Sequence, residues 1–188
     1  MTNIKLDKMS DVKKWALLLG IMCGDGCLSY HHSKKGKEMF FISVTGNYYN
    51  DQPFFKEIVV PLFIYFRNKE IPIKNKSYSG AIEINFSDKK LFNQIHLSGF
   101  PIGKKGPLLE ISKEFYKKQI INKIIQGFFA TDGCFSITKN NNYFYPRIVI
   151  KTIHKNFMLK MFNHLTSFGL RGSFLLSKSV SHEGWKAN

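Results

Sequence analysis

The segment Leu18-Leu19-Gly20-Ile21-Met22-Cys23-Gly24-Asp25-Gly26 ends an apolar run with one carboxylate. The same pattern returns 107 residues later as Ile125-Gln126-Gly127-Phe128-Phe129-Ala130-Thr131-Asp132-Gly133. The match continues past both aspartates, because Asp25-Gly26-Cys27-Leu28-Ser29 is repeated as Asp132-Gly133-Cys134-Phe135-Ser136. A buried carboxylate costs several kcal/mol unless a cation, a metal or hydrogen-bond donors compensate it. The repeat therefore indicates an internal duplication in which the two aspartates share a purpose.

Both segments predict helices that can approach each other closely. Gly20 and Gly24 lie on one face of the first helix, and Gly127 and Thr131 on one face of the second, because residues four apart stack on adjacent turns. Packing along these faces would bring the two aspartates together around a pseudo-twofold axis. Helix C-termini add negative partial charge and carbonyl oxygens, which favour hard divalent cations such as Mg²⁺ or Mn²⁺. Such ions can activate water and stabilise a leaving oxygen in phosphodiester hydrolysis.

The composition favours a globular nucleic-acid-binding protein. The 188 residues are 44% hydrophobic, enough for one substantial core, and 28 Lys+Arg against 13 Asp+Glu give a net charge of +15. No segment has the length and apolarity of a membrane span, and the N-terminus does not resemble a secretory signal. Three cysteines without a second Cys or His pair at metal spacing predict small buried hydrophobes in a reducing compartment. We expect an intracellular protein, of an organelle or of a prokaryotic cytoplasm, without a membrane partner.

Periodicity predicts an α+β protein of two related lobes, with boundaries 1–98 for the first lobe, 99–111 for the linker and 112–188 for the second. The first lobe has the order α-β-β-α-β-β-α, with elements at 11–24, 27–35, 37–45, 51–68, 71–79, 81–87 and 88–97. Gly26 is expected to supply a left-handed cap after the first helix. The second lobe repeats the order at 112–131, 134–140, 143–152, 155–168 and 170–179. It lacks counterparts of about 81–100, so its last strand and helix are missing.

At the two motifs the sequence resembles the LAGLIDADG homing endonucleases, specifically the single-chain class with two copies of the motif. Pro101-Ile102-Gly103-Lys104-Lys105 is similar to the lysine-bearing linker that often precedes the second motif. The resemblance implies two pseudo-twofold-related αββαββα lobes whose saddle-shaped antiparallel sheets bind double-stranded DNA over a long target site. It also implies a monomeric, metal-dependent endonuclease that hydrolyses phosphodiester bonds in both strands. Because position 1 is Met and not the Cys or Ser of an intein, we expect a free-standing or intron-encoded product.

The resemblance implies roles for individual residues at the catalytic centre. Asp25 and Asp132 would bind the divalent ions, assisted by the backbone carbonyls of Gly24 and Thr131. A basic group that organises water near the metals would be Lys104, Lys105 or Lys151. The family often carries glutamine at the end of the second strand of each lobe, and this sequence departs from that pattern with Thr45-Gly46 and Lys151-Thr152.

Strand alternation predicts which side chains face DNA, on the side of each sheet opposite Leu28 and Phe135. In the first lobe these are Ser29, His31, Ser33 and Lys35, with Lys74, Lys76 and Tyr78 as additions from other strands. In the second lobe they are Ser136, Thr138, Asn140, Tyr145, Arg147 and Lys151. Polar residues on a sheet face also occur simply as solvated surface.

Several alternatives remain open at this point. An intron RNA-splicing maturase would use the same basic saddle, and a non-catalytic DNA-binding regulator could be built from a decayed copy of the scaffold. A basic ribosomal protein is a more distant alternative, because the two aspartates would have no role in it. The short second half suggests a truncated enzyme or one whose missing elements come from another polypeptide. Exposed apolar side chains would then promote association, and we expect them at Phe157, Met158, Met161, Phe162 and Phe168.

Overall fold

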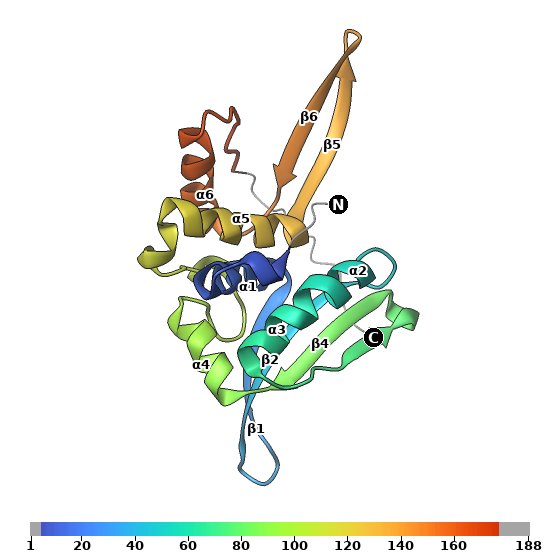
Figure 1. Cartoon of the computed structure of the whole chain (residues 1–188), viewed down its shortest axis with the longest axis vertical. Helices are drawn as coiled ribbons and strands as arrows, with labels where there is room; N and C mark the ends of the chain where they lie inside the picture. Colours follow the sequence, from blue (N-terminus) through green and yellow to red (C-terminus); the bar gives the residue numbers. More distant parts are fainter. Residues whose placement is uncertain (1–4, 177–188) are drawn as a thin grey trace.

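The two motif helices lie side by side at the centre of the molecule (Figure 1). The computed structural model describes residues 5–176, and in that range α1 spans Asp11–Asp25 and α5 spans Lys118–Asp132. A Cβ added to Gly20 would lie 3.0 Å from the Gly127 Cα, and one added to Gly127 would lie 2.8 Å from the Ile21 nitrogen. The backbones therefore touch where the sequence places its small residues, as predicted.

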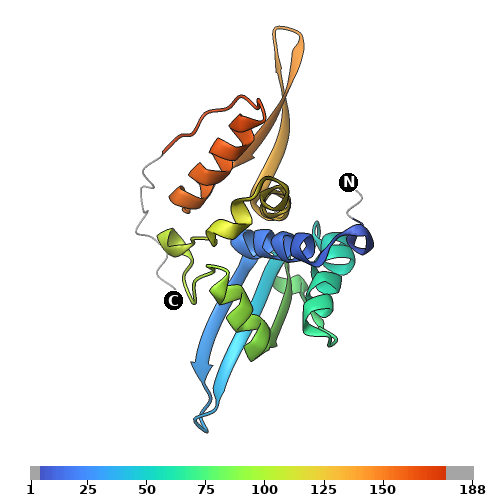
Figure 2. The same ribbon diagram turned by 60° about the vertical axis from the view of Figure 1, so that its left-hand side comes forward.

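The first lobe contains a four-stranded antiparallel sheet of β1 (Gly26–His32), β2 (Glu38–Asn47), β4 (Ala81–Ser87) and β3 (Ile73–Lys76), in that spatial order. One face carries the alternating apolar residues, among them the fully buried Leu28, Ile42 and Ile84. Helices α3 (Val60–Arg67) and α4 (Lys89–Leu97) lie on this side of the sheet (Figure 2). Sheet alternation thus separates a core face from an open face.

A helical run precedes α3 and includes a local irregularity. It begins with α2 (Gln52–Phe54), widens into a π-helical turn at Phe55–Val59 and continues as α3. Pro61 has no N–H to donate to the carbonyl four residues earlier, and the π turn lies directly before it. The predicted helix at 51–68 is confirmed in extent, because Asn68 ends it in the left-handed region at φ 55°.

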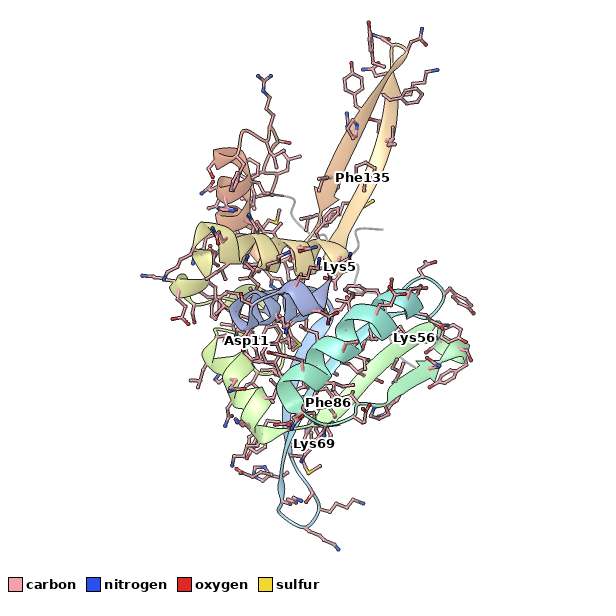
Figure 3. The ribbon with its side chains drawn as sticks, viewed as in Figure 1. Lys5, Asp11, Lys56, Lys69, Phe86 and Phe135 are labelled. Atoms are coloured by element: carbon pink, nitrogen blue, oxygen red, sulfur yellow. The ribbon has the colours of Figure 1, made fainter. Side chains whose placement is uncertain are left out.

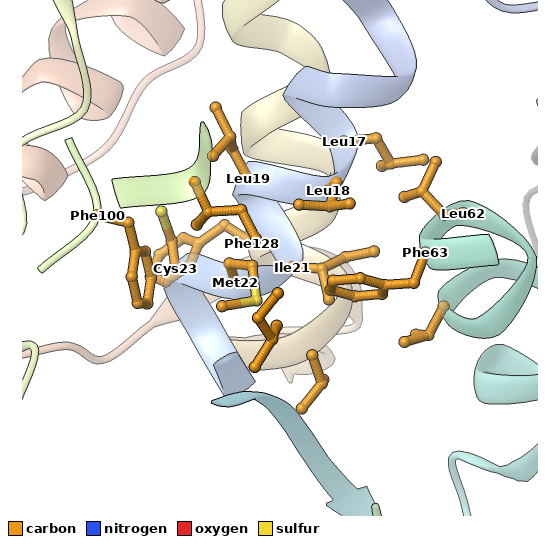
Figure 4. Close-up of a cluster of buried hydrophobic side chains, with 14 of the residues drawn as sticks. Leu17, Leu18, Leu19, Ile21, Met22, Cys23, Leu62, Phe63, Phe100 and Phe128 are labelled. Carbon is orange, nitrogen blue, oxygen red and sulfur yellow. The ribbon is translucent and has the colours of Figure 1, made fainter. Parts of the chain in front are cut away.

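The core is built around α1, which is buried on nearly all of its faces. Leu17, Leu18 and Ile21 are fully buried beside Leu62 and Phe63 of α3, as Figure 4 shows. Other core members shown there come from α5 and from the segment after α4. A helix that is apolar all round belongs in the interior, and α1 fills the space between α5 and the first sheet.

The second lobe has a two-stranded sheet within the described residues. Strands β5 (Gly133–Asn140) and β6 (Tyr143–Ile150) form a hairpin, which α6 (Lys155–Ser167) follows. Phe135 pairs with Ile148 as Leu28 pairs with Ile42 in the first lobe, yet Phe135 is 59% exposed and Leu28 is 0% exposed. Phe135 lies on the hairpin that projects from the motif helices (Figure 3). The counterpart of the core face is thus largely open to solvent.

The linker packs tightly against the first lobe. Its ends meet through the Ser112 N–H, which donates to the Ser98 carbonyl at 3.0 Å, and Leu109 and Ile111 are buried. The Gly103 N–H donates to the Leu28 carbonyl at 2.7 Å, which holds the middle of the linker beside β1. None of the described helices is long and apolar enough to cross a membrane.

Several predicted boundaries were wrong because local pattern does not fix where pairing stops. The helix expected from 112 begins at Lys118, after a 3₁₀ turn at Lys113–Tyr116 and an extended Lys117. The strand expected at 27–35 ends at His32. The strand expected at 143–152 ends at Ile150, where residues 5–176 contain no β4-like strand to extend the pairing. The strand expected at 170–179 has no regular structure over 170–176, and 177–179 lie outside the described residues.

Other local predictions were also wrong. Gly26 has φ −83° and begins β1 in extended conformation, so it is not a left-handed cap. Cys134 is exposed, unlike the buried Cys23. Phe157 and Met161 are buried, and Phe157 stacks edge-to-face on Phe128 of α5 with ring centroids 5.3 Å apart, whereas Phe168 is 46% exposed.

Candidate active site

The site lies where α1 and α5 end together. Asp25 and Asp132 are the last residues of the two helices, and both are partly buried. Burial and then the Asp132 carboxylate raise the pKa of Asp25 to about 6, and burial raises the pKa of Asp132. A Cβ added to Gly24 would lie 3.3 Å from the Asp132 Oδ1, so the end of α1 meets the carboxylate of α5 directly. The pairing predicted from the duplication is thus present.

Lys105 is the cation of this centre. Its Nζ lies 3.1 Å from the Cys23 carbonyl oxygen and 3.4 Å from that of Met22, and it also donates to the Gly24 carbonyl. Its positive charge lowers the pKa of both aspartates against the larger effect of burial. Lys104, its neighbour in the chain, is exposed. The structure therefore distinguishes Lys105, which contacts the end of α1, from the exposed Lys104, whereas sequence pattern alone did not favour either.

A shallow basic pocket opens beside Asp132. It is lined by Gly24, Lys104, Lys105, Gly106, Asp132, Lys151, Thr152, Ile153 and His154. Lys151 directly follows Ile150, which pairs with Gly133 as Val44 pairs with Gly26, so Lys151 takes the position of Thr45. All three lysines named as candidates for the basic group thus meet at one pocket, although only Lys105 contacts the end of α1.

Sequence reasoning missed His154, which is 5% exposed and belongs to the same pocket. Its Nδ1 lies 2.6 Å from the Gly106 carbonyl oxygen, which assigns the proton to Nδ1 and leaves Nε2 without one. Burial lowers the pKa of His154, so the neutral ring is favoured. A lone histidine before a helix forms no sequence pattern. Its place in the pocket is seen only from its contact with the Gly106 carbonyl of the linker.

In the first lobe, the structure places four of the predicted DNA-facing residues on the open face of the sheet. Ser29 and His31 lie there on β1, and Lys74 and Lys76 lie there on β3. Glu83 shares this face and binds Lys76 at 2.6 Å, which offsets one positive charge. Thr45 and Asn85 also share it and were missed, although the alternation of β2 and β4 would have indicated both.

Three of the predicted first-lobe residues are not in strands. Ser33 and Lys35 lie in the turn between β1 and β2, where the Ser33 Oγ accepts a hydrogen bond from the Lys37 N–H at 3.0 Å. Tyr78 lies in the 3₁₀ turn Ser77–Ser79 and is 88% exposed. The assumption that strand alternation continues through these positions was wrong, because the chain reverses there.

In the second lobe the predicted residues share one face of the hairpin. The register pairs Ser136 with Arg147, Thr138 with Tyr145 and Asn140 with Tyr143. The opposite face is apolar except for Lys139 near the turn, and it carries the exposed Phe135, Ile137 and Ile148. Lys151 lies beyond the end of β6 and belongs to the pocket at the helix ends.

Of the two residues Thr45-Gly46 where the resembling family often has glutamine, Gly46 is closed to a larger side chain and Thr45 is not. A Cβ added to Gly46 would lie 2.7 Å from a ring carbon of Phe55 and 2.8 Å from the Asp51 Oδ2. Asp51 in turn accepts a hydrogen bond from the Asn47 N–H at 2.6 Å. The packing near the end of β2 therefore leaves room only for glycine at position 46. The neighbouring Thr45 lies on the open face of the sheet.

The donors at the helix ends suit a hard divalent cation. Two carboxylates whose ionised forms are disfavoured by burial gain from a nearby cation, and the carbonyls at the end of α1 already receive a lysine ammonium. Asp25, Asp132 and the carbonyls of Gly24 and Thr131 are the atoms that would hold the metal. Within residues 5–176 no cluster of three or more His, Cys, Asp or Glu side chains offers an alternative metal site.

Comparison with known proteins decides the fold. No protein-family model and no curated protein sequence matches the chain. A structure of mesophilic variants of the homing endonuclease I-DmoI matches at a TM-score of 0.66 and 18% identity, over 90% of this chain and 81% of that chain. The chain has the LAGLIDADG homing endonuclease fold.

Other structures with the LAGLIDADG fold give the same result. The crystal structure of I-DmoI in complex with DNA and Ca matches at a TM-score of 0.62 and 19% identity, over 90% of this chain and 80% of that chain. The LAGLIDADG meganuclease I-AabMI bound to uncleaved DNA matches at 0.52 and 13% identity, over 88% of this chain and 75% of that chain. The fold class expected from the duplicated motif is confirmed, while the roles of the site residues remain predictions.

Proposed function

We propose that this chain is a site-specific DNA endonuclease that hydrolyses phosphodiester bonds in both strands of a long duplex target with the help of a divalent metal. The observation that carries the proposal is the meeting of Asp25 and Asp132 at the ends of two closely packed helices, beside a pocket rich in lysine. Solved neighbours with this fold are bound to DNA with Ca or Mn. Mg²⁺ or Mn²⁺ is the metal proposed here.

Each part of the site has a definable task in this proposal. A metal bound by the two aspartates would supply activated water and charge stabilisation at the scissile phosphates. Lys104 and Lys151 would attract the DNA backbone to the pocket, since surface lysines neutralise phosphates without reading sequence. The open faces of the two sheets would contact the two half-sites, the first with four strands and the second with the two strands found within residues 5–176.

The lobe boundaries at 1–98, 99–111 and 112–188 and an intracellular, organellar or prokaryotic location belong to this proposal as well. So does a monomeric state, with association as the alternative if the open hairpin face is covered by another polypeptide. The minor groove gives physical support to cleavage at adjacent helix ends, because its width of about 6 Å brings two phosphates close together.

A non-catalytic DNA-binding protein is the second candidate. It is favoured by Thr45-Gly46, where this chain lacks the glutamine that the family often carries and where the packing of Phe55 and Asp51 leaves no room for a side chain at Gly46. A maturase would differ by preferring structured RNA to duplex DNA.

The test is cleavage of a randomised duplex library with Mg²⁺ or with EDTA, using the wild type beside Asp132→Asn. Staggered cuts at a recurring site, found only for the wild type with metal, would support the endonuclease. Binding without any cutting would favour the second candidate, and retention of folded RNA over duplex would favour the maturase.

A further inference from the structure

The end of α1 is capped by a residue from outside the helix. α1 carries no basic residue in its own last turn, although its final carbonyls and the helix dipole favour a cation there. Lys105 of the linker supplies it, with its Nζ directed at the carbonyl oxygens of Met22, Cys23 and Gly24. A lysine ammonium has three protons to donate, so these three carbonyls can use its full capacity.

The backbone on either side of Lys105 is held in place. The Gly103 N–H donates to the Leu28 carbonyl at 2.7 Å, and the Gly106 carbonyl lies 2.6 Å from the His154 Nδ1. The first contact fixes the linker to the first lobe and the second fixes it to the second lobe. Any exchange at the end of α1 must therefore come from rotation of the Lys105 side chain, which has a flexible four-carbon stem.

We propose that the Lys105 ammonium and the divalent ion are alternative occupants of the end of α1, so that metal binding requires Lys105 to leave the Gly24 carbonyl. This inference rests on the proposed metal site. If the Gly24 oxygen bound an ammonium and a metal ion at once, the two cations would lie only about 4 Å apart in partly buried surroundings, where like charges repel strongly. In the metal-free protein Lys105 offsets the two carboxylates, and the ion takes over that task when it binds.

The pocket beside the site offers a destination for the displaced side chain. Lys105 lines it together with Lys104 and Lys151, and it is open to solvent where the proposed DNA backbone would lie. A phosphate there would stabilise the withdrawn ammonium. DNA and metal would consequently assist each other's binding, because each favours the same position of Lys105.

The experiment measures Mn²⁺ binding to the DNA-free protein by the loss of the free-ion EPR signal, for the wild type, Lys105→Met and Lys104→Met. Lys104→Met is the matched control, since it removes the same charge from an exposed neighbour. Lys105→Met should bind Mn²⁺ about tenfold more tightly than the wild type, given the strength of a unit charge at contact distance in partly buried surroundings. Lys104→Met should change the affinity by less than about threefold, because exposed charges are screened.

Two further variants keep the result interpretable. Lys105→Gln retains a hydrogen-bond donor for the carbonyls without the charge, and it should show the gain even if Lys105→Met folds poorly. Adding Asp25→Asn to Lys105→Met should abolish the gain, which locates it at the helix ends. Equal, weaker or undetectable Mn²⁺ binding by both folded Lys105 variants would overturn the inference.

The outcome is separable from that of the proposed function. A gain in Mn²⁺ affinity without DNA cleavage would support competition between Lys105 and the metal ion and would contradict the proposed endonuclease activity. Metal-dependent cleavage by the wild type without any gain in Mn²⁺ affinity in the Lys105 variants would support the endonuclease and contradict the competition.

Discussion

Asp132 places its carboxylate close enough to Asp25 to raise the pKa of Asp25, in addition to the larger effect of burial, so that Asp25 titrates at about 6. The fold therefore holds together two acids 107 residues apart in the sequence, although their ionised forms are disfavoured there. The positive charge of Lys105 partly offsets this unfavourable effect. Such an arrangement is typical of sites that bind cations or perform acid–base chemistry.

Asp25→Asn should stabilise the metal-free protein at neutral pH. A carboxyl group whose folded pKa is raised from 3.8 to about 6 favours the folded state below pH 3.8 and loses that contribution as pH rises through 6. With a discount for solvent screening of a partly exposed group, the variant should gain about 1–2 kcal/mol at pH 7.5 in EDTA. Urea unfolding at pH 3.5 and 7.5 checks this. A loss of stability at pH 7.5 would mean that Asp25 makes a structural contact worth more than its burial costs.

His154→Gln should reduce the sensitivity of the fold to mild acid. Burial lowers the pKa of His154, so the wild type keeps its stability above the unfolded value of 6.5 and loses it as pH falls toward the folded pKa. The variant removes this titration and can retain an amide contact to the Gly106 carbonyl. Unfolding curves for both proteins between pH 5 and 8 isolate the histidine, because all other groups are common to them. Parallel pH profiles would contradict the assignment.

Gly20→Ala should destabilise the helix pair strongly. The added Cβ would lie 2.9 Å from the Ile124 carbonyl carbon and 3.0 Å from the Gly127 Cα, and backbone cannot move aside as a side-chain tip can. We expect a loss of about 2–4 kcal/mol in urea unfolding. Gly172→Ala is the control, since its Cβ would meet only Phe162 at an ordinary 3.4 Å and should change stability little. Similar values for the two variants would refute close helix packing.

Leu28→Ala and Phe135→Ala compare equivalent positions in the two lobes. Leu28 is fully buried, and its truncation should cost about 2–5 kcal/mol. Phe135 is 59% exposed, so its truncation should cost less than about 1 kcal/mol and should reduce any self-association seen by sedimentation. A large loss at Phe135 would show that the hairpin face is covered in solution.

Arg147→Ala should weaken DNA binding and lower the slope of log affinity against log salt by about 1, if Arg147 neutralises one phosphate. Lys90→Ala is the control, because Lys90 belongs to α4 on the opposite side of the first sheet. Fluorescence anisotropy between low and high salt gives both slopes. An unchanged slope for Arg147→Ala would remove the hairpin from the DNA interface.

The duplication carried enough information to predict the motif helices, the order of strands in the first lobe and the meeting of Asp25 with Asp132. Each depends on local periodicity or on the repeat itself. Lys105 was one of three candidate lysines, but its selection over Lys104 and Lys151 and the place of His154 in the pocket could not be predicted, because both depend on how the linker folds back between the lobes. The prediction that Ser33, Lys35 and Tyr78 face DNA from strands was wrong for a related reason, because alternation does not indicate where a strand ends and the chain reverses.

A second lobe without its last strand and helix was predicted from a count of residues, but the apolar side chains that are exposed within residues 5–176 were not. The count indicated a missing strand and helix, and the exposure was expected on the helix at 155–168. The structure buries Phe157 and Met161 of that helix against α5 and instead leaves Phe135, Ile137 and Ile148 of the hairpin exposed. The hairpin loses its cover because no counterpart of α4 or β4 is present among the described residues.

The most direct test of the central claim measures DNA binding and cleavage side by side for the wild type, Asp25→Asn and Asp132→Asn, with each strand of the selected duplex labelled separately. If the two aspartates hold the catalytic metal, both variants should remain folded, bind the duplex and fail to cut both strands in Mg²⁺. Full cleavage of both strands by either folded variant would contradict the account.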